Sequence, residues 1–202
     1  MDTKNLSTIA TGLILALGLS AGAGLAQAAT FSGEAVALRA NALGVSLTLA
    51  DTGALPAGGG NLSTSAASVN VAGLASADTL QSSTSGSGSS SQSQSSIQDL
   101  KLLNGLVAAD VVRSNSSASC NGSTATSSGS SEIAGLVVAG QSVLVSSPNL
   151  AISLPGGISV VVNEQTSSQG GSAGATTVNA VHVKGPGIDV VVASAHSDIT
   201  CP

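Results

Sequence analysis

Aromatic side chains are almost absent from this chain of 202 residues, which has no Trp, no Tyr and a single Phe, Phe31. Sugar-binding modules usually stack sugar rings on Trp or Tyr, so this absence counts against a lectin or a glycosidase. Val, Ala, Leu and Ile must then fill the interior, and each small side chain buries less area than an aromatic ring. We therefore expect two closely packed layers.

Charged side chains are also scarce. Only 7% of the residues are Asp, Glu, Lys or Arg, and the net charge is −5. The few basic residues are scattered, so the basic patch that binding to nucleic-acid phosphates requires is missing. We expect no nucleic-acid partner. Solubility must come from Ser, Thr, Asn and Gln, as is typical of a protein outside the cell.

The first 28 residues have the pattern of a secretory signal peptide. Lys4 lies in a short polar segment, an apolar stretch covers residues 12–25, and Ala26-Gln27-Ala28 supplies small residues for the peptidase. The apolar stretch is shorter than the ~20 residues that cross a bilayer. We expect cleavage after Ala28 or Ala29, a secreted or cell-surface protein, and no transmembrane segment after cleavage. The alternative is an uncleaved N-terminal anchor.

Cys120 and Cys201 are the two cysteines of the chain. An even number in an exported protein predicts a disulfide bond, which here would tie the end of the chain to its centre. The alternative is two free, buried thiols. Neither cysteine has a Cys or His partner at the spacing of a zinc site, so we expect no metal and no cofactor.

The apolar segments alternate with period two, are rich in β-branched residues and end at glycines, which predicts strands rather than helices. Asn104-Gly105 is a strong signal for a two-residue hairpin turn, and 185–187 marks another turn. A segment that begins at Gly73 is similar to one that begins at Gly105, which indicates a repeat. We predict an all-β fold, an antiparallel hairpin-repeat β-sandwich, with a β-solenoid as the alternative.

Residues 29–202 are expected to form a single secreted β domain. Two tracts interrupt the apolar pattern, near residues 81–96 and 114–131, and both consist largely of Ser, Gly, Gln, Asn and Thr. Tracts of this composition bury little apolar surface to offset the entropy of ordering. We predict that both are long Ser-rich surface loops.

Few side chains can carry chemistry. Residues 170–174 match the G-x-S-x-G pattern of a hydrolase nucleophile elbow, but a strand rather than the required helix is predicted after them. His182 alternates with valines and is expected to face outward from its strand. Asn163, Glu164 and Gln165 form the densest polar cluster after an apolar strand. We predict a polar binding edge there and assign no catalytic residue.

Several segments, in their order and spacing, make the chain similar to the choice-of-anchor P family of exported bacterial proteins. These segments are residues 31–35, 50–56, 131–136, 162–166 and 195–201. The resemblance implies a secreted or surface-displayed domain of unknown biochemical role, without established catalytic residues. Family members carry varied C-terminal anchors, whereas this chain ends at Cys201-Pro202 without a sortase motif, so we expect it to be released or held non-covalently.

The function expected from these patterns is a non-enzymatic secreted or cell-surface module, structural or adhesive. Its partner would be an extracellular or cell-surface molecule, and exposed strand edges could also support self-association. One alternative is a secreted hydrolase that uses Ser172 or Glu164, which the lack of converging ionisable groups disfavours. The other is an ice- or mineral-binding surface protein, which would need a regular Thr ladder.

Overall fold

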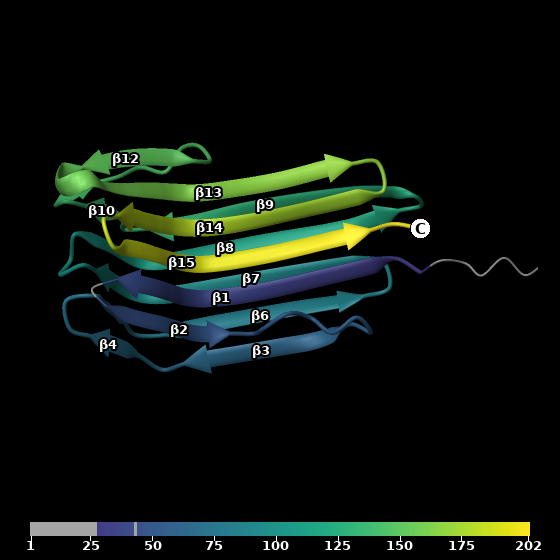
Figure 1. Cartoon of the computed structure of the whole chain (residues 1–202), viewed down its shortest axis with the longest axis horizontal. Helices are drawn as coiled ribbons and strands as arrows, with labels where there is room; N and C mark the ends of the chain where they lie inside the picture. The colour runs from purple at the N-terminus through teal and green to yellow at the C-terminus, as the bar shows by residue number, and fades with distance from the viewer. Residues whose placement is uncertain (1–27, 43) are drawn as a thin grey trace, which may run out of the picture.

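The computed structural model describes residues 28–42 and 44–202. The predicted signal peptide therefore lies outside the described residues, apart from Ala28. Figure 1 shows two sheets stacked face to face, with the strands of both running along the long axis of the molecule. No helix in the described part of the chain is long and apolar enough to cross a membrane.

Sheet A, the front layer in Figure 1, has the strand order β12-β13-β14-β15-β1-β2. Every pairing in it is antiparallel. A short 3-10 helix, η1 (Pro155–Gly157), joins β12 to β13. The strands are β1 (Thr30–Ala42), β2 (Val45–Asp51), β12 (Leu150–Leu154), β13 (Ile158–Gly170), β14 (Ala173–Gly185) and β15 (Ile188–Thr200).

Sheet B, the rear layer, is built on the long strands β3, β6, β7, β8 and β9, which pair in that order and are all antiparallel. Short strands extend it at one end. The strands are β3 (Gly60–Ala66), β4 (Val69–Val71), β5 (Ala75–Ala77), β6 (Leu80–Ser87), β7 (Ser90–Leu102), β8 (Val107–Asn121), β9 (Thr124–Ala134), β10 (Val137–Val138) and β11 (Gln141–Ser142).

The antiparallel β-sandwich is therefore confirmed, and the β-solenoid alternative is wrong because neighbouring strands are joined mainly as hairpins within each sheet. The predicted hairpin at Asn104-Gly105 joins β7 to β8. Its turn is longer than two residues, because the ladder closes with Leu102 opposite Val107. The turn predicted at 185–187 joins β14 to β15 and has two residues, because Gly185 pairs with Ile188.

The two Ser-rich tracts are strands, so the prediction of surface loops near 81–96 and 114–131 is wrong. The first tract holds most of β6 and the first half of β7, and the second holds parts of β8 and β9. In residues 91–95 every Ser is buried and every Gln is exposed. A tract of alternating Ser and Gln can therefore bury one face of a strand, provided that most of its buried hydroxyls find hydrogen-bond partners.

The buried hydroxyls find these partners among the backbone carbonyls of the opposite sheet and among one another. The hydroxyls of Ser91 and Ser93 in β7 donate to the backbone carbonyls of Asp198 and His196 in β15, at 3.0 and 2.7 Å. These bonds join sheet B directly to sheet A. Others join neighbouring buried side chains within sheet B: Ser82 with Ser95 at 3.0 Å, and Thr84 with Ser93 at 2.8 Å.

The alternation of buried and exposed side chains changes phase within the long strands. In β7 the buried side chains are Ser91, Ser93, Ser95 and Ile97 on one side of Asp99, and Leu100 and Leu102 on the other. Asp99 itself has a left-handed backbone, with φ of 51°. A single left-handed residue reverses which side of the sheet the following side chains face. In β7 the buried positions therefore change from odd-numbered to even-numbered residues at Asp99.

This change of phase forms a line across both sheets, which we call the crease. At the crease the regular pairing of neighbouring strands is interrupted. In β1 and β2 it is interrupted at Ala37 and Ala50, and in β7 and β8 at Asp99 and Asp110. Left-handed residues recur on the line in sheet A, with φ of 48° at Ala50 and Ala193 and 53° at Asn163. A left-handed backbone costs a non-glycine residue roughly 1–2 kcal/mol.

The crease divides the interior into two halves of different chemistry. On one side lies the main apolar core, whose fully buried members are chiefly Leu, Val and Ala. On the other side lies the hydroxyl half, with buried Ser and Thr. Here the layers approach closely, since a Cβ on Gly33 would lie 2.5 Å from Oγ1 of Thr84. Beyond the hydroxyl half, Ala118, Ala125, Ile199 and Cys201 form a small apolar cluster that closes the end of the sandwich.

Ser114 and Ser116 provide a matched test of the hydroxyl half. Both are buried in β8, but the hydroxyl of Ser116 bonds to that of Ser197 at 2.9 Å, whereas the hydroxyl of Ser114 has no partner in the described part of the protein. We expect Ser116→Ala to lower the free energy of unfolding by about 1 kcal/mol. We expect Ser114→Ala to leave it unchanged or to raise it by about 1 kcal/mol, because an unbonded buried hydroxyl is costly.

Urea unfolding of the two variants measures this difference. Equal losses of stability in both would contradict the hydrogen-bond network assigned to the hydroxyl half.

Candidate functional site

The outward side of sheet B carries three rows of polar side chains that cross its five long strands. We call these residues the amide–hydroxyl face. The row nearest the disulfide end is Asn61, Ser85, Gln92, Ser117 and Ser128. The middle row is Ser63, Ser83, Gln94, Asn115 and Ser130. The third row is Ser65, Gln81, Ser96, Arg113 and Glu132.

The face is hollowed rather than flat. One hollow of about 400 Å³ lies over β3, β6, β7 and β8, between Ser65 and Asn115. A second, of about 430 Å³, lies over β7, β8 and β9. A third, also about 430 Å³, lies over the ends of β3, β6 and β7. The hollows adjoin one another because Gln94 and Asn115 line the first two, and Gln92 lines the second and third.

Most polar groups of the face are free to bind a ligand. Within the described residues, the side-chain hydrogen bonds of the face are those of Ser117 with Ser128 and of Arg113 with Glu132. In the part of the chain that the structure describes, no side chain bonds to the amide groups of the face, which belong to Asn61, Gln81, Gln92, Gln94 and Asn115. Each amide can both donate and accept.

The charge of the face is close to neutral. Its two charged members, Arg113 and Glu132, form an ion pair at 3.2 Å. Negative charge lies at its border, where Asp99 and Asp110 face each other at the crease and both are exposed. Among residues 28–42 and 44–202, no group of His, Cys, Asp and Glu side chains is placed to hold a metal ion.

The outward side of sheet A has a different character, with a charged cluster around His182. Both ring nitrogens of His182 contact carboxylates: Nδ1 lies 2.6 Å from Glu164, and Nε2 lies 2.8 Å from Asp189. Asn179 and Lys184 also donate to Glu164, at 2.7 and 3.2 Å. Because a carboxylate only accepts, both contacts of the ring are hydrogen bonds when both nitrogens carry a proton.

These neighbours lower the pKa of the Glu164 carboxyl. Burial raises the pKa of its carboxyl, but the hydrogen bonds from Asn179 and His182, the charge of His182 and the bond from Lys184 outweigh it, so the pKa lies below the ordinary value of 4.5. The charged form is therefore favoured. This arrangement stabilises a carboxylate and its partners on a sheet surface.

Asn163, Glu164 and Gln165, the predicted binding edge, lie in the middle of β13. Asn163 is the left-handed residue of the crease in this strand and accepts a hydrogen bond from the Gln165 side chain at 2.8 Å. The backbone N–H of Gln165 donates to Asn149 at 2.8 Å. The three residues thus support local structure, and whether they also bind a partner stays a prediction.

Ser172 lies at the tip of the hairpin between β13 and β14. Gly170 pairs with Ala173, so Gly171 and Ser172 form a two-residue turn, and Gly171 has φ of 56°. The turn is followed by a strand, as expected, whereas a nucleophile elbow requires a helix after the turn. The carbonyl of Ser172 accepts a hydrogen bond from the N–H of Cys201 at 2.7 Å.

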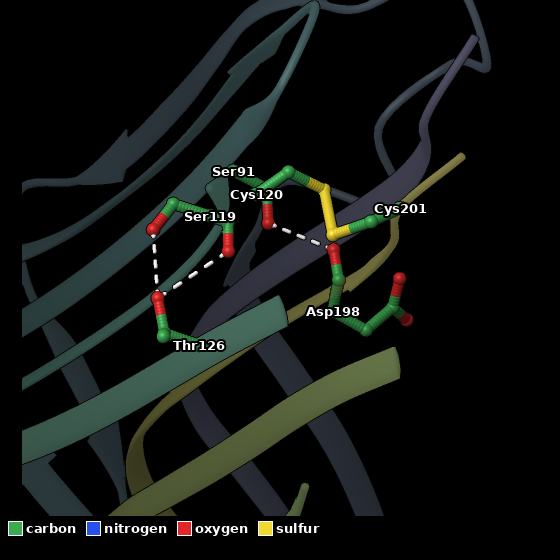
Figure 2. Close-up of a disulfide and its surroundings, with 6 residues drawn as sticks. All are labelled: Ser91, Ser119, Cys120, Thr126, Asp198 and Cys201. Atoms are coloured by element: carbon green, nitrogen blue, oxygen red, sulfur yellow. Dashed lines mark hydrogen bonds between the residues drawn. A yellow bond between two sulfur atoms is a disulfide. The ribbon is translucent and has the colours of Figure 1, made fainter. Parts of the chain in front are cut away.

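The predicted disulfide between Cys120 and Cys201 is confirmed, and it joins the two sheets at the end of the hydroxyl half (Figure 2). The residues are 81 positions apart, and their Cα atoms are separated by 5.6 Å. In the chain-entropy account, closing a loop of this length stabilises the folded state by about 4–5 kcal/mol. Figure 2 also shows the Ser91–Asp198 bond between the sheets close to the disulfide.

Comparisons with known proteins give no relative. No family model matches the chain, and no curated protein and no solved structure is similar to it. The resemblance to the choice-of-anchor P family therefore stays a prediction.

The cluster around Glu164 predicts a specific pH dependence. The carboxyl has a lower pKa in the folded state than in the unfolded state, so the stability that it contributes is present above pH 4.5 and is lost as pH falls through the folded value. We expect Glu164→Gln to reduce the loss of stability on acidification below this pH. Thr166→Ala, two positions along the same side of β13, is the matched control.

Urea unfolding at a series of pH values from neutral to acid checks this expectation. A Glu164→Gln variant whose stability falls as steeply as that of the parent, with Thr166→Ala also unchanged, would show that the cluster does not stabilise the carboxylate.

Proposed function

We propose that the protein is a non-enzymatic, secreted or cell-surface adhesive module that contacts its partner through the amide–hydroxyl face. The observation that carries the proposal is the regular placement of free amides and hydroxyls over five paired strands. Gln92 and Gln94 lie at its centre and border the adjoining hollows. A face of this kind offers many directed hydrogen bonds, and its one carboxylate, Glu132, is paired with Arg113.

The face is also held rigid, which favours binding. Its strands are anchored from behind by the buried hydroxyls, as in the bonds of Ser91 and Ser93 to β15. The disulfide fixes the end of β8 to sheet A. A surface that is already ordered loses less entropy when it binds.

The disulfide supports a location outside the cytoplasm, because disulfides persist in oxidising compartments. The signal-peptide pattern of the first 28 residues and the resemblance to exported proteins agree with this location. Secretion or display at the cell surface is part of the proposal.

The edge of sheet B at β9 supports adhesion less well than the face does. On the free side of β9, the N–H of Ala125 donates to Gly171 at 2.9 Å, and Gln169 donates to the carbonyl of Ser127 at 2.9 Å. These bonds occupy backbone groups that an added strand would need. The geometry therefore favours the amide–hydroxyl face as the contact surface over self-association through β9.

Bead adhesion tests the proposal. Beads coated with the exported protein are expected to adhere to the producing cells and to the matrix that they deposit. Ser83→Glu/Gln94→Glu places two unpaired carboxylates in the face and should reduce bound beads about tenfold. Ser46→Glu/Thr48→Glu adds the same charge on exposed positions of β2 and should change nothing. No adhesion by the parent protein, or equal loss in both variants, would contradict the proposal.

A further inference from the structure

We infer that the amide–hydroxyl face binds an extended, uncharged polysaccharide, an inference that rests on the proposed function and names its ligand. The groups on the face have a double hydrogen-bonding character. Ser hydroxyls and the amides of Asn and Gln both donate and accept hydrogen bonds. A partner that uses both capacities offers donors and acceptors at repeated positions. The hydroxyl groups of a sugar chain do so.

The charge on and around the face also limits the choice of ligand. Arg113 and Glu132 neutralise each other, and the other members of the three rows are uncharged. Exposed Asp99 and Asp110 border the face, with exposed Lys101 next along β7, and this net negative charge would repel a polyanion, such as a nucleic acid or a uronic-acid polymer. The rows offer no free carboxylate to attract a polycation. An uncharged polymer is the ligand that fits.

The spacing of the strands suits an extended ligand. Neighbouring strands of a sheet lie about 4.7–4.9 Å apart, and every second residue along a strand is separated by about 6.6–6.8 Å. A chain that crosses the strands therefore meets a new polar side chain at each strand. The hollows adjoin one another along this direction, because Gln92, Gln94 and Asn115 are shared between them.

The absence of Trp and Tyr counts against a lectin that stacks sugar rings, so it limits the inference to a ligand held by hydrogen bonds alone. A pocket for one sugar ring usually includes an aromatic platform, and this face has none. Each sugar unit can then add only hydrogen bonds, so a single sugar binds weakly. A polymer that engages several rows at once gains from their combined contacts. The ligand is therefore a chain rather than a monosaccharide.

Co-sedimentation of the exported protein with insoluble cellulose, chitin and β-1,3-glucan tests the inference, with polygalacturonate beads as the charged probe. We expect binding to at least one neutral polymer and none to polygalacturonate. Nuclear magnetic resonance then locates the contact. Soluble oligosaccharides of the bound polymer should shift the side-chain amide signals of Gln92, Gln94 and Asn115.

The double variant Gln92→Ala/Gln94→Ala is expected to bind the neutral polymer at least tenfold more weakly. Gln98→Ala is the matched control, because Gln98 is exposed on the same strand but lies outside the hollows. If the double variant melts at a lower temperature than the parent, Asn115→Ala is measured in its place.

The inference is overturned if no neutral polymer binds, if only polygalacturonate binds, or if neither variant of the face weakens binding more than Gln98→Ala does. Its failure can be told apart from failure of the proposed function. Beads that adhere and lose adhesion with Ser83→Glu/Gln94→Glu, in a protein that binds none of the neutral polymers, leave the adhesive role standing and remove the polysaccharide. Beads that never adhere remove the adhesive role itself.

Discussion

Hydrogen bonds between buried hydroxyls and the opposite sheet hold the part of this sandwich on which the rest depends. Ser91 and Ser93 reach from β7 to carbonyls of β15, and Ser116 reaches Ser197. An interior lined by Ser and Thr buries less apolar surface than one lined by Val and Leu, so unpaired hydroxyls in it are costly. Because most of its buried hydroxyls are paired, with Ser114 an exception, tracts that look too polar to fold become long, ordered strands.

That ordering creates the candidate site. When Ser91, Ser93 and Ser95 turn inward, Gln92 and Gln94 must turn outward, and the neighbouring strands align their own polar residues beside them. The disulfide closes the same end of the sandwich, beside the small apolar cluster. The main apolar core lies beyond the crease. The surface proposed to bind therefore lies over the hydroxyl half and not over the main apolar core.

The sequence predicted the all-β class, the antiparallel sandwich, several turns and the disulfide, because period-two apolar patterns and glycine turns are local signals. The prediction for the Ser-rich tracts was wrong, because it relied on their composition, which is typical of loops. The alternation of Ser and Gln in 91–95 has the two-residue period of a strand, and this signal could have located the amide–hydroxyl face. The crease could not be foreseen, because nothing local marks Ala50 or Ala193 as left-handed. The contacts of His182 with Glu164 and Asp189 depend on the register of three strands.

Amide hydrogen exchange of residues 91–95 and 114–118 tests the central claim most directly. If paired hydroxyls hold these segments as inner strands, their backbone amides exchange slowly, within about tenfold of the amides of β14 and β15 in the apolar half. Exchange at the rate of an unstructured chain in both segments, in a protein whose apolar half remains protected, would contradict the account and return these tracts to surface loops.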